Sequence, residues 1–289
     1  MEEILLQAEG LCYSYGQEKK ALKGIDLTVR KGEKIAVLGS NGAGKSTCFL
    51  TLNGVLTPDS GKIRYRGKEI GKRELNELRR NVGIVFQDAD NQIIASTVFA
   101  EVSFGPMNLR LSKDEVKARV QSALTCMNLT GTEDRPPHYL SGGEKKRVSI
   151  ADIIAMEPEV ILFDEPTASL DPVNVEMLKD VLDKMAGLGK TLVISTHDVD
   201  FAFQWADRAL VFAGGSIIAD GPVREVFHSR EVLERANLRK PVLMEVYESL
   251  VKNGIMKEEN CPRNTKELDA FLSEKRTEQK EIDRMKCTV

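Results

Sequence analysis

The sequence predicts an α/β fold in which a largely parallel β-sheet is covered by helices. Short apolar segments with strand character alternate with helix-compatible segments along the chain, as expected for such a sheet. One segment leads into the glycine-rich turn G-x-x-x-x-G-K-S directly before a helix-compatible stretch, and another ends in two adjacent acids. These three observations favour a phosphate-binding α/β protein.

Length and composition set the limits of this prediction. The 289 residues suffice for one large domain, or one domain with a smaller appendage, and a hydrophobic content of 42% supports a sizeable core. The net charge of −3 is nearly balanced, so we expect no nucleic-acid partner. The five cysteines are scattered and form no C-x-x-C pair, which indicates reduced thiols and no transition-metal site within the chain.

No signal or membrane-spanning segment is expected. The opening Met1-Glu2-Glu3-Ile4 is acidic, whereas a secretory signal begins with basic residues. No stretch approaches the roughly 18 apolar residues that a spanning helix needs. Any membrane role must therefore come through a partner.

The N-terminal part of the chain reads mainly as strands. Runs of apolar and β-branched residues predict strands at Ile4 to Tyr15, Ala21 to Val29 and Lys34 to Leu38. Residues 45–52 are helix-compatible. A further strand pair is expected within residues 61–70, with Gly67-Lys68 as its turn.

The middle and C-terminal parts predict more helix. A helix over residues 112–128, capped by Ser112, is followed after Pro136-Pro137 by a second helix over residues 144–156. Buried strands are expected at residues 160–163 and 191–195, and an appended helical region from about residue 221. The charged segment 257–286 is either a solvated helix or tail, or a contact with a partner.

The glycine-rich turn carries the first chemical signal. Its glycines let successive backbone N–H groups turn toward a phosphate, and the following helix adds its positive dipole end. Lys45 would reach the β- and γ-phosphates, and the Ser46 hydroxyl would bind Mg²⁺. The predicted ATP-binding residues of this turn are Gly39, Ser40, Asn41, Gly42, Ala43, Gly44, Lys45, Ser46 and Thr47.

Two acids at the end of an apolar strand carry the second signal. Asp164 is placed to hold Mg²⁺ through water, and Glu165 to polarise an attacking water molecule. Because a second acid follows and no acceptor substrate is evident, hydrolysis is favoured over transfer to an acceptor.

A third motif, Leu140-Ser141-Gly142-Gly143-Glu144, lies between these two. Ser141 and the N–H groups of Gly142 and Gly143 open a helix and make a second anion site. The combination resembles the signature of the ATP-binding-cassette (ABC) ATPases, with Glu144 where glutamine is commoner. In that family the site closes on the γ-phosphate held by another subunit, so the resemblance implies a head-to-tail homodimer or heterodimer of ATPases that binds ATP and Mg²⁺.

Further roles follow from this resemblance, which covers about residues 4–226. It implies that Tyr15 stacks on adenine, that Gln87 contacts Mg²⁺ and senses a membrane partner, and that His197 touches the γ-phosphate. Ser169 and Asp171 resemble the loop that crosses the dimer interface. The implied domains are an ATPase domain at 1–220, with an antiparallel β subdomain at its N-terminus and a helical signature subdomain at about 88–156, and an extension at 221–289.

The segment from Gln87 to Gln92, with the stretch 98–106, is similar to the ATPases of energy-coupling-factor importers. In these, acids such as Asp88 and Asp90 would line a groove for a transmembrane coupling subunit, which works with a substrate-binding membrane subunit. Residues 137–148 are most similar to the cobalt-import ATPases of the CbiO type. The resemblance implies an ATP-driven importer subunit for cobalt or nickel, peripheral on the cytoplasmic face of the cell membrane. A vitamin importer of the same branch and an ABC ATPase without transport remain alternatives.

Overall fold

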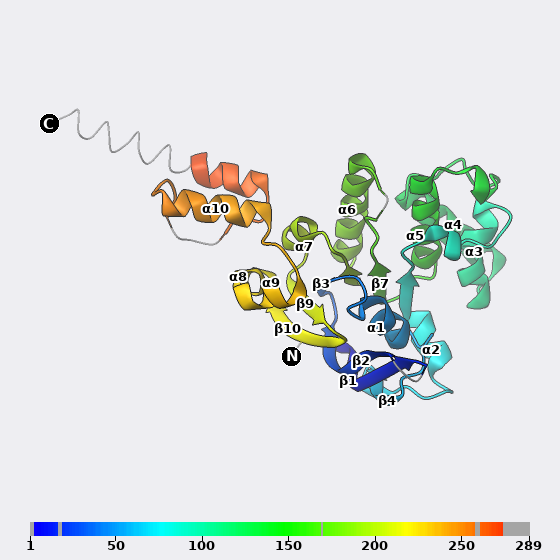
Figure 1. Cartoon of the computed structure of the whole chain (residues 1–289). Coiled ribbons are helices and arrows are strands. Elements are labelled where there is room, and N and C mark those ends of the chain that lie inside the picture. The colour runs from blue at the N-terminus through cyan, green and yellow to red at the C-terminus, as the bar shows by residue number, and fades with distance from the viewer. Residues whose placement is uncertain (1–2, 17–18, 169, 258–260, 274–289) are drawn as a thin grey trace.

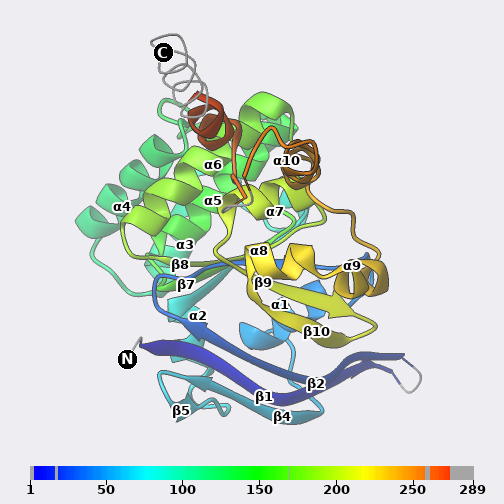
Figure 2. The same ribbon diagram turned by 90° about the vertical axis from the view of Figure 1, so that its left-hand side faces the viewer.

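Two β-sheets and a set of helices make up the protein (Figures 1 and 2). The computed structural model describes residues 3–16, 19–168, 170–257 and 261–273. A four-stranded sheet has the order β2-β1-β4-β5, and a six-stranded sheet has the order β10-β9-β3-β8-β7-β6.

The four-stranded sheet is antiparallel throughout. It consists of β1 (Ile4–Tyr15), β2 (Lys19–Arg30), β4 (Ser60–Tyr65) and β5 (Lys68–Glu69). Ala8 pairs with Leu27 on one side and Ile63 on the other, which fixes β1 in the middle. The expected strand pair within 61–70 is present, but its turn is Arg66-Gly67, one residue earlier than predicted, because β5 already begins at Lys68.

The six-stranded sheet is parallel except at the β9–β10 edge. Its strands are β3 (Lys34–Leu38), β6 (Val82–Val85), β7 (Val160–Asp164), β8 (Thr191–Ser195), β9 (Arg208–Ala213) and β10 (Ser216–Pro222). β7 and β8 are buried at every position, as expected for central parallel strands covered on both faces. Their pairing brings Asp164 opposite Ser195, so the functional strand ends meet at one edge.

Helices cover the two faces of the parallel sheet. The central helix α1 (Lys45–Leu52) lies between the two sheets, where Phe49 and Leu52 share an apolar core with residues of both (Figure 2). The opposite face is covered by the helices α5 (Gly142–Ala155), α6 (Pro172–Gly187) and α7 (Val199–Trp205), whose apolar residues belong to a second core. The short helix α2 (Leu75–Asn81) precedes β6.

Three helices form a lobe beside the sheets (Figure 1). They are α3 (Val98–Asn108), α4 (Lys113–Cys126) and α5, which contact one another. Ser112 caps α4 as predicted, its hydroxyl accepting from the N–H of Glu115. α5 begins at Gly142, two residues before the expected start, because Ser141 is its N-cap.

The C-terminal region is helical, as expected. It contains α8 (Val223–His228), α9 (Arg230–Ala236) and α10 (Val242–Lys252), and residues 265–273 are also helical. Phe227, Leu233 and Met244 belong to the same apolar core as the sheet helices. β10 runs through Pro222, across the proposed domain boundary at residue 220, which remains a prediction.

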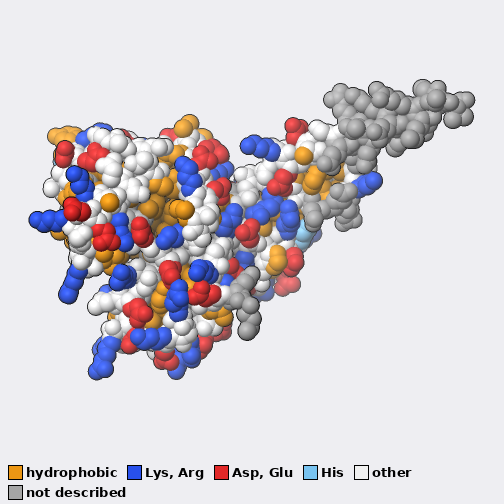
Figure 3. All heavy atoms as spheres, turned by 180° about the vertical axis from the view of Figure 1, so that it is seen from behind, with side chains coloured by type: hydrophobic (Ala, Val, Ile, Leu, Met, Phe, Trp, Pro, Cys, Tyr) orange, Lys and Arg blue, Asp and Glu red, His pale blue; other side chains and the backbone are white. Residues whose placement is uncertain are grey.

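The surface mixes charged and hydrophobic side chains. Seen from behind, lysines, arginines and acids are interspersed over the molecule, with hydrophobic side chains between them (Figure 3). Among the described helices, none combines the length and the apolar character needed to cross a bilayer.

Candidate active site

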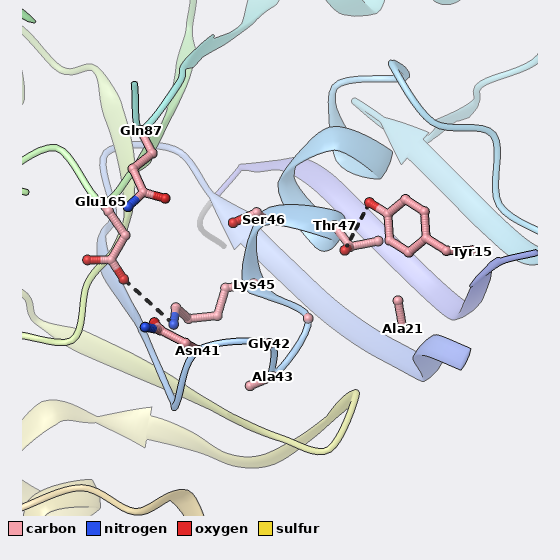
Figure 4. A pocket seen from close by; sticks show the side chains of 11 residues that line it. Tyr15, Ala21, Asn41, Gly42, Ala43, Lys45, Ser46, Thr47, Gln87 and Glu165 are labelled. Atoms are coloured by element: carbon pink, nitrogen blue, oxygen red, sulfur yellow. Dashed lines mark hydrogen bonds and ion pairs between the residues drawn. The ribbon is translucent and has the colours of Figure 1, made fainter. Parts of the chain in front are cut away.

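A cavity of about 250 Å³ lies at the start of α1 and collects most of the residues predicted from the glycine-rich turn (Figure 4). It receives side chains from the turn, from β1, and from the ends of β6 and β7. Its lining residues are Tyr15, Ala21, Asn41, Gly42, Ala43, Gly44, Lys45, Ser46, Thr47, Gln87 and Glu165. Gly39 and Ser40 lie beside it, and their carbonyl groups accept hydrogen bonds from the Lys45 ammonium at 2.7 and 3.3 Å.

The turn needs glycine at two positions for different contacts. A Cβ on Gly39 would clash with the carbonyl oxygen of Phe212, and one on Gly44 would lie 2.7 Å from the carbonyl oxygen of Ala21. Gly44 has a φ of 109°, which side-chain-bearing residues rarely adopt. α1 starts there with no side-chain cap and no acid in its first turn, so its N-terminus is open to an anion.

Lys45 and Glu165 form a buried ion pair at the base of this cavity. Their side chains are 6% and 7% exposed, and the ammonium lies 3.6 Å from Oε1 of Glu165. The other oxygen, Oε2, lies 2.8 Å from Nδ1 of His197 and also accepts from the backbone N–H of His197 at 3.3 Å. Oε1 is buried and accepts no hydrogen bond among the described residues, so its capacity as an acceptor is unused although it is ion-paired with Lys45.

Ser195 bridges the Asp164 side chain and the Glu165 backbone. Its hydroxyl donates to Oδ1 of Asp164 at 2.6 Å and accepts from the N–H of Glu165 at 3.0 Å. Glu165 itself has a φ of 45°, in the left-handed region, which is costly for a side-chain-bearing residue. This backbone bend turns Glu165 toward Lys45, whereas the Asp164 carboxylate stays with Ser195.

Tyr15 lies at the opposite end of the cavity (Figure 4). Its ring is half exposed, packs edge-on against Tyr13, and its hydroxyl is 3.3 Å from the Thr47 hydroxyl oxygen. An exposed aromatic face at the mouth of a phosphate-binding turn can stack on a planar base.

The donor chemistry around the cavity fits Mg²⁺. Ser46 is exposed, and Gln87 lines the same cavity. Asp164 ends the adjacent strand, and the hydrogen bond given for its carboxylate among the described residues uses Oδ1, not Oδ2. Hydroxyl, amide and carboxylate oxygens are the ligands that this ion prefers.

Lys146 and Gln92 connect the Gln87 segment to α5, a role that was predicted for neither residue. The Lys146 ammonium donates to the carbonyl oxygens of Phe86 and Gln87 at 2.7 and 2.9 Å. Burial lowers the pKa of Lys146 to about 8, although the carboxylates of Asp164 and Asp88 act in the opposite direction. A signal was present: Lys146, Ile150 and Ile153 recur at i, i+4 and i+7 on the buried face of α5.

The start of α5 is open to the surface. Ser141 and Gly142 are exposed, and Ser141 forms a capping box with Glu144. The Ser141 hydroxyl accepts from the N–H of Glu144 at 3.2 Å, while the Glu144 carboxylate accepts from the N–H of Ser141 at 2.8 Å. The hydroxyl proton of Ser141 is not used in this box and can be donated to a ligand. Gly143 packs against Asn174, which would lie 3.0 Å from an added Cβ.

The remaining predicted residues lie outside the cavity. Asp171 is the N-cap of α6 and accepts from the N–H and the amide of Asn174. Asp88 caps the short 3₁₀ helix Ala89–Asn91, and Asp90 pairs with Lys145 at 2.6 Å. Asp90 is therefore a partly neutralised acid. Ser169 lies outside the described residues.

Comparison with known protein families shows which family has this site. The family model described as ABC transporter matches residues 22–168, which include the phosphate-binding turn, the α5 start and both strand-end acids. This chain belongs to the ABC transporter family. The predicted resemblance and the predicted fold are thus confirmed, and the chain carries an ABC transporter ATPase domain.

Several members of the ABC transporter family resemble this chain over most of its length. The energy-coupling factor transporter ATP-binding protein EcfA2 of Methanospirillum hungatei is 47% identical over 263 residues, covering 90% of this chain. This chain spans only 66% of that relative. The cobalt import ATP-binding protein CbiO of Rhodobacter capsulatus is 47% identical over 244 residues, covering 84% of this chain and 87% of the relative.

A solved structure agrees with these relatives. CbiO1 from Clostridium perfringens, described as part of the ABC transporter complex CbiONQ, has a TM-score of 0.72 and 42% sequence identity. It covers 86% of this chain, and all of the CbiO1 chain is matched.

Proposed function

We propose that this chain hydrolyses ATP as the energy-coupling subunit of an ABC importer of the energy-coupling-factor branch. The observation that carries the proposal is the buried Glu165 carboxylate, which lies between Lys45 and His197 at the phosphate-binding cavity and whose Oε1 accepts no hydrogen bond among the described residues. A carboxylate oxygen at that position with unused acceptor capacity is suited to take a proton from water that attacks the terminal phosphorus atom.

Each part of the cavity then has a defined task. The open N-terminus of α1 and the Lys45 ammonium bind the β- and γ-phosphates, and the Tyr15 ring stacks on the base. Ser46, Gln87 and Asp164 would hold Mg²⁺, which neutralises charge on the phosphates when it is bound. Glu165 accepts the proton of the attacking water, a P–O bond forms to water oxygen, and the bond to the β-phosphate oxygen breaks.

The exposed start of α5 supports an assembly of two ATPase subunits. Ser141, Gly142 and Gly143 do not line the cavity of their own chain, so the N–H groups of the two glycines and the Ser141 hydroxyl are available to a second copy. Each ATP would then be bound by the phosphate turn of one subunit and the α5 start of the other. His197, 67% exposed and paired with Glu165 here, would turn to the γ-phosphate when the subunits close.

The membrane partner and the cargo are the finer part of the proposal. The relatives named EcfA2 and CbiO support an importer that contains a transmembrane coupling subunit and a substrate-binding subunit, which would place this chain at the cytoplasmic face of the membrane. The name of the Rhodobacter relative favours cobalt over a vitamin. Reconstitution with the membrane subunits, followed by uptake of Co²⁺, Ni²⁺ and vitamins, would distinguish these cargoes.

Replacement of Glu165 by Gln tests the hydrolytic assignment. The amide keeps the shape of the side chain but cannot accept the proton, so we expect turnover to fall about 100-fold or more, the usual range for loss of a general base. ATP-dependent dimers should persist, as measured by size-exclusion chromatography with light scattering. Glu69→Gln, at an exposed ion pair on β5, is the matched control. Wild-type turnover in Glu165→Gln would contradict the proposed mechanism.

A further inference from the structure

One buried lysine connects the two functional ends of this chain. Lys146 is 4% exposed, and its ammonium donates to the carbonyl oxygens of Phe86 and Gln87. These carbonyl groups follow the last residue of β6, Val85, and therefore lie outside the ladder of the parallel sheet. A side chain from α5 thus supplies the hydrogen bonds that the sheet no longer provides.

A second side chain fixes the same point from the other side. The amide oxygen of Gln92 accepts from the N–H of Phe86 at 3.2 Å. Its amide nitrogen donates to the carbonyl oxygen of Ser149 at 2.7 Å and to Asp152 at 3.2 Å. Both backbone polar groups of Phe86 are therefore tied to α5, directly through Lys146 and indirectly through Gln92.

The position of these contacts along α5 matters. Ser141, the N-cap, is only five residues before Lys146, so about 7.5 Å of regular helix separates the exposed start from the buried ammonium. A helix with intact backbone hydrogen bonds moves as a rigid element over that length. A movement of the α5 start therefore carries the carbonyl groups of Phe86 and Gln87 with it, unless the Lys146 contacts break.

We propose that Lys146 is a positioning residue that couples the two nucleotide sites of the assembled ATPase. The inference rests on the proposed function, in which the α5 start binds the nucleotide of the second subunit while Gln87 faces the nucleotide and Mg²⁺ of its own chain. Engagement of the α5 start with one ATP then sets the position of Gln87 beside the other ATP. Loss of Lys146 would leave each half-site formed but remove the direct connection between them, so that only the indirect one through Gln92 remains.

The test compares Lys146→Met with Lys146→Arg and with Lys145→Met in the full chain. Methionine fills a similar volume without donating, and arginine can again donate to both carbonyl groups. Lys145 is the neighbouring lysine, whose ammonium pairs with the exposed Asp90. Three quantities are measured: ATP binding in EDTA, turnover as a function of Mg²⁺ at fixed ATP, and the Hill coefficient of turnover against Mg-ATP.

In Lys146→Met we expect the Mg²⁺ concentration for half-maximal turnover to rise about tenfold, as for the loss of hydrogen bonds from a charged donor. The Hill coefficient should fall toward one. ATP binding in EDTA should stay within about twofold of wild type, since Lys146 does not line the cavity. Lys146→Arg should recover most of the Mg²⁺ dependence, and Lys145→Met should match wild type.

Unchanged Mg²⁺ dependence and cooperativity in Lys146→Met would overturn the inference while leaving the proposed function intact. Equal loss of ATP binding in EDTA would also overturn it, because it would show general damage to the fold. Should Lys146→Met fail to fold by circular dichroism, Gln92→Leu removes the second connection and is expected to raise the Mg²⁺ requirement in the same direction; no change there refutes the coupling. Absence of turnover in the wild-type chain itself would instead refute the proposed function.

Discussion

Replacement of Asp152 by Asn is expected to stabilise the protein at neutral and alkaline pH. Asp152 is on α5 and faces the helical lobe, where its Oδ2 accepts from Gln92 at 3.2 Å. The pKa of Asp152 is raised from 3.8 to about 6, mainly by burial; the hydrogen bond from Gln92 opposes the rise, and the nearby Glu101 carboxylate adds to it. The folded protein therefore binds this proton more tightly than the unfolded chain does.

The sign and size of the effect follow from this difference. Below about pH 3.8 the carboxyl group is protonated in both states and contributes no difference. As the pH rises from 3.8 to about 6 the unfolded chain ionises first, so stability falls, and above pH 6 the full cost is present. A shift of about two pH units corresponds to about 3 kcal/mol. Because the side chain keeps some solvent contact, we expect about 1–2 kcal/mol.

Urea unfolding at pH 5, 6, 7 and 8 measures this prediction. Asn keeps an acceptor for the Gln92 amide but removes the charge, so the advantage of Asp152→Asn should grow from pH 5 to pH 7 and then level off. Asp180→Asn, at an exposed position on α6, is the control and should show no such growth. A pH-independent difference, or a less stable Asp152→Asn at pH 8, would refute the reasoning.

Two further substitutions test the anion sites. Gly44→Ala would place a Cβ 2.7 Å from the Ala21 carbonyl oxygen, at a residue whose φ is 109°. We therefore expect a stability loss of about 1–3 kcal/mol in thermal unfolding, and weaker ATP binding in a titration. ATP affinity equal to that of the wild type would contradict the geometry. Glu144→Ala removes the bond to the Ser141 N–H and should cost about 1 kcal/mol at pH 7, with Glu144→Gln less affected. The Ser141 N–H lowers the pKa of Glu144 below 4.5, so this contribution should vanish as the pH falls further below 4.5; an unchanged difference at low pH would count against it.

Sequence reasoning located the elements that have strong local signals. β1, β3 and β8 and the central helix α1 have the predicted bounds. β3 and β8 are short, mainly apolar runs, β1 mixes apolar and polar residues before the break at Gly16, and α1 directly follows the glycine-rich turn. The helix α3 was not predicted. Gly105 and Pro106 discourage a helix, but both are near its C-terminal end, and Gly105 leaves room there for the Met156 side chain.

The phosphate turn could also be predicted, whereas its surroundings could not. The turn residues are adjacent in the sequence, and the glycines are needed for backbone conformations that lie within this one segment. Ser195 gives no such signal: it acts only because β7 and β8 pair in parallel with Asp164 opposite Ser195. The resemblance supplied Gln87 and His197, but their contacts depend on which strand ends are neighbours in the sheet.

The burial of Lys146 could have been predicted from the periodicity of the helix. A lysine two residues after a signature motif looks like a solvated side chain, yet its spacing to Ile150 and Ile153 places it on the buried face of α5. A lysine on such a face must have acceptors, since an unpaired buried ammonium is far too costly. The periodicity therefore predicts that a partner exists, and only the fold reveals that the partner is the backbone at Gln87. Helix periodicity thus indicates that α5 is hydrogen-bonded to a neighbouring segment close to its exposed N-terminus. This contact is the physical basis for expecting the two nucleotide sites to act together.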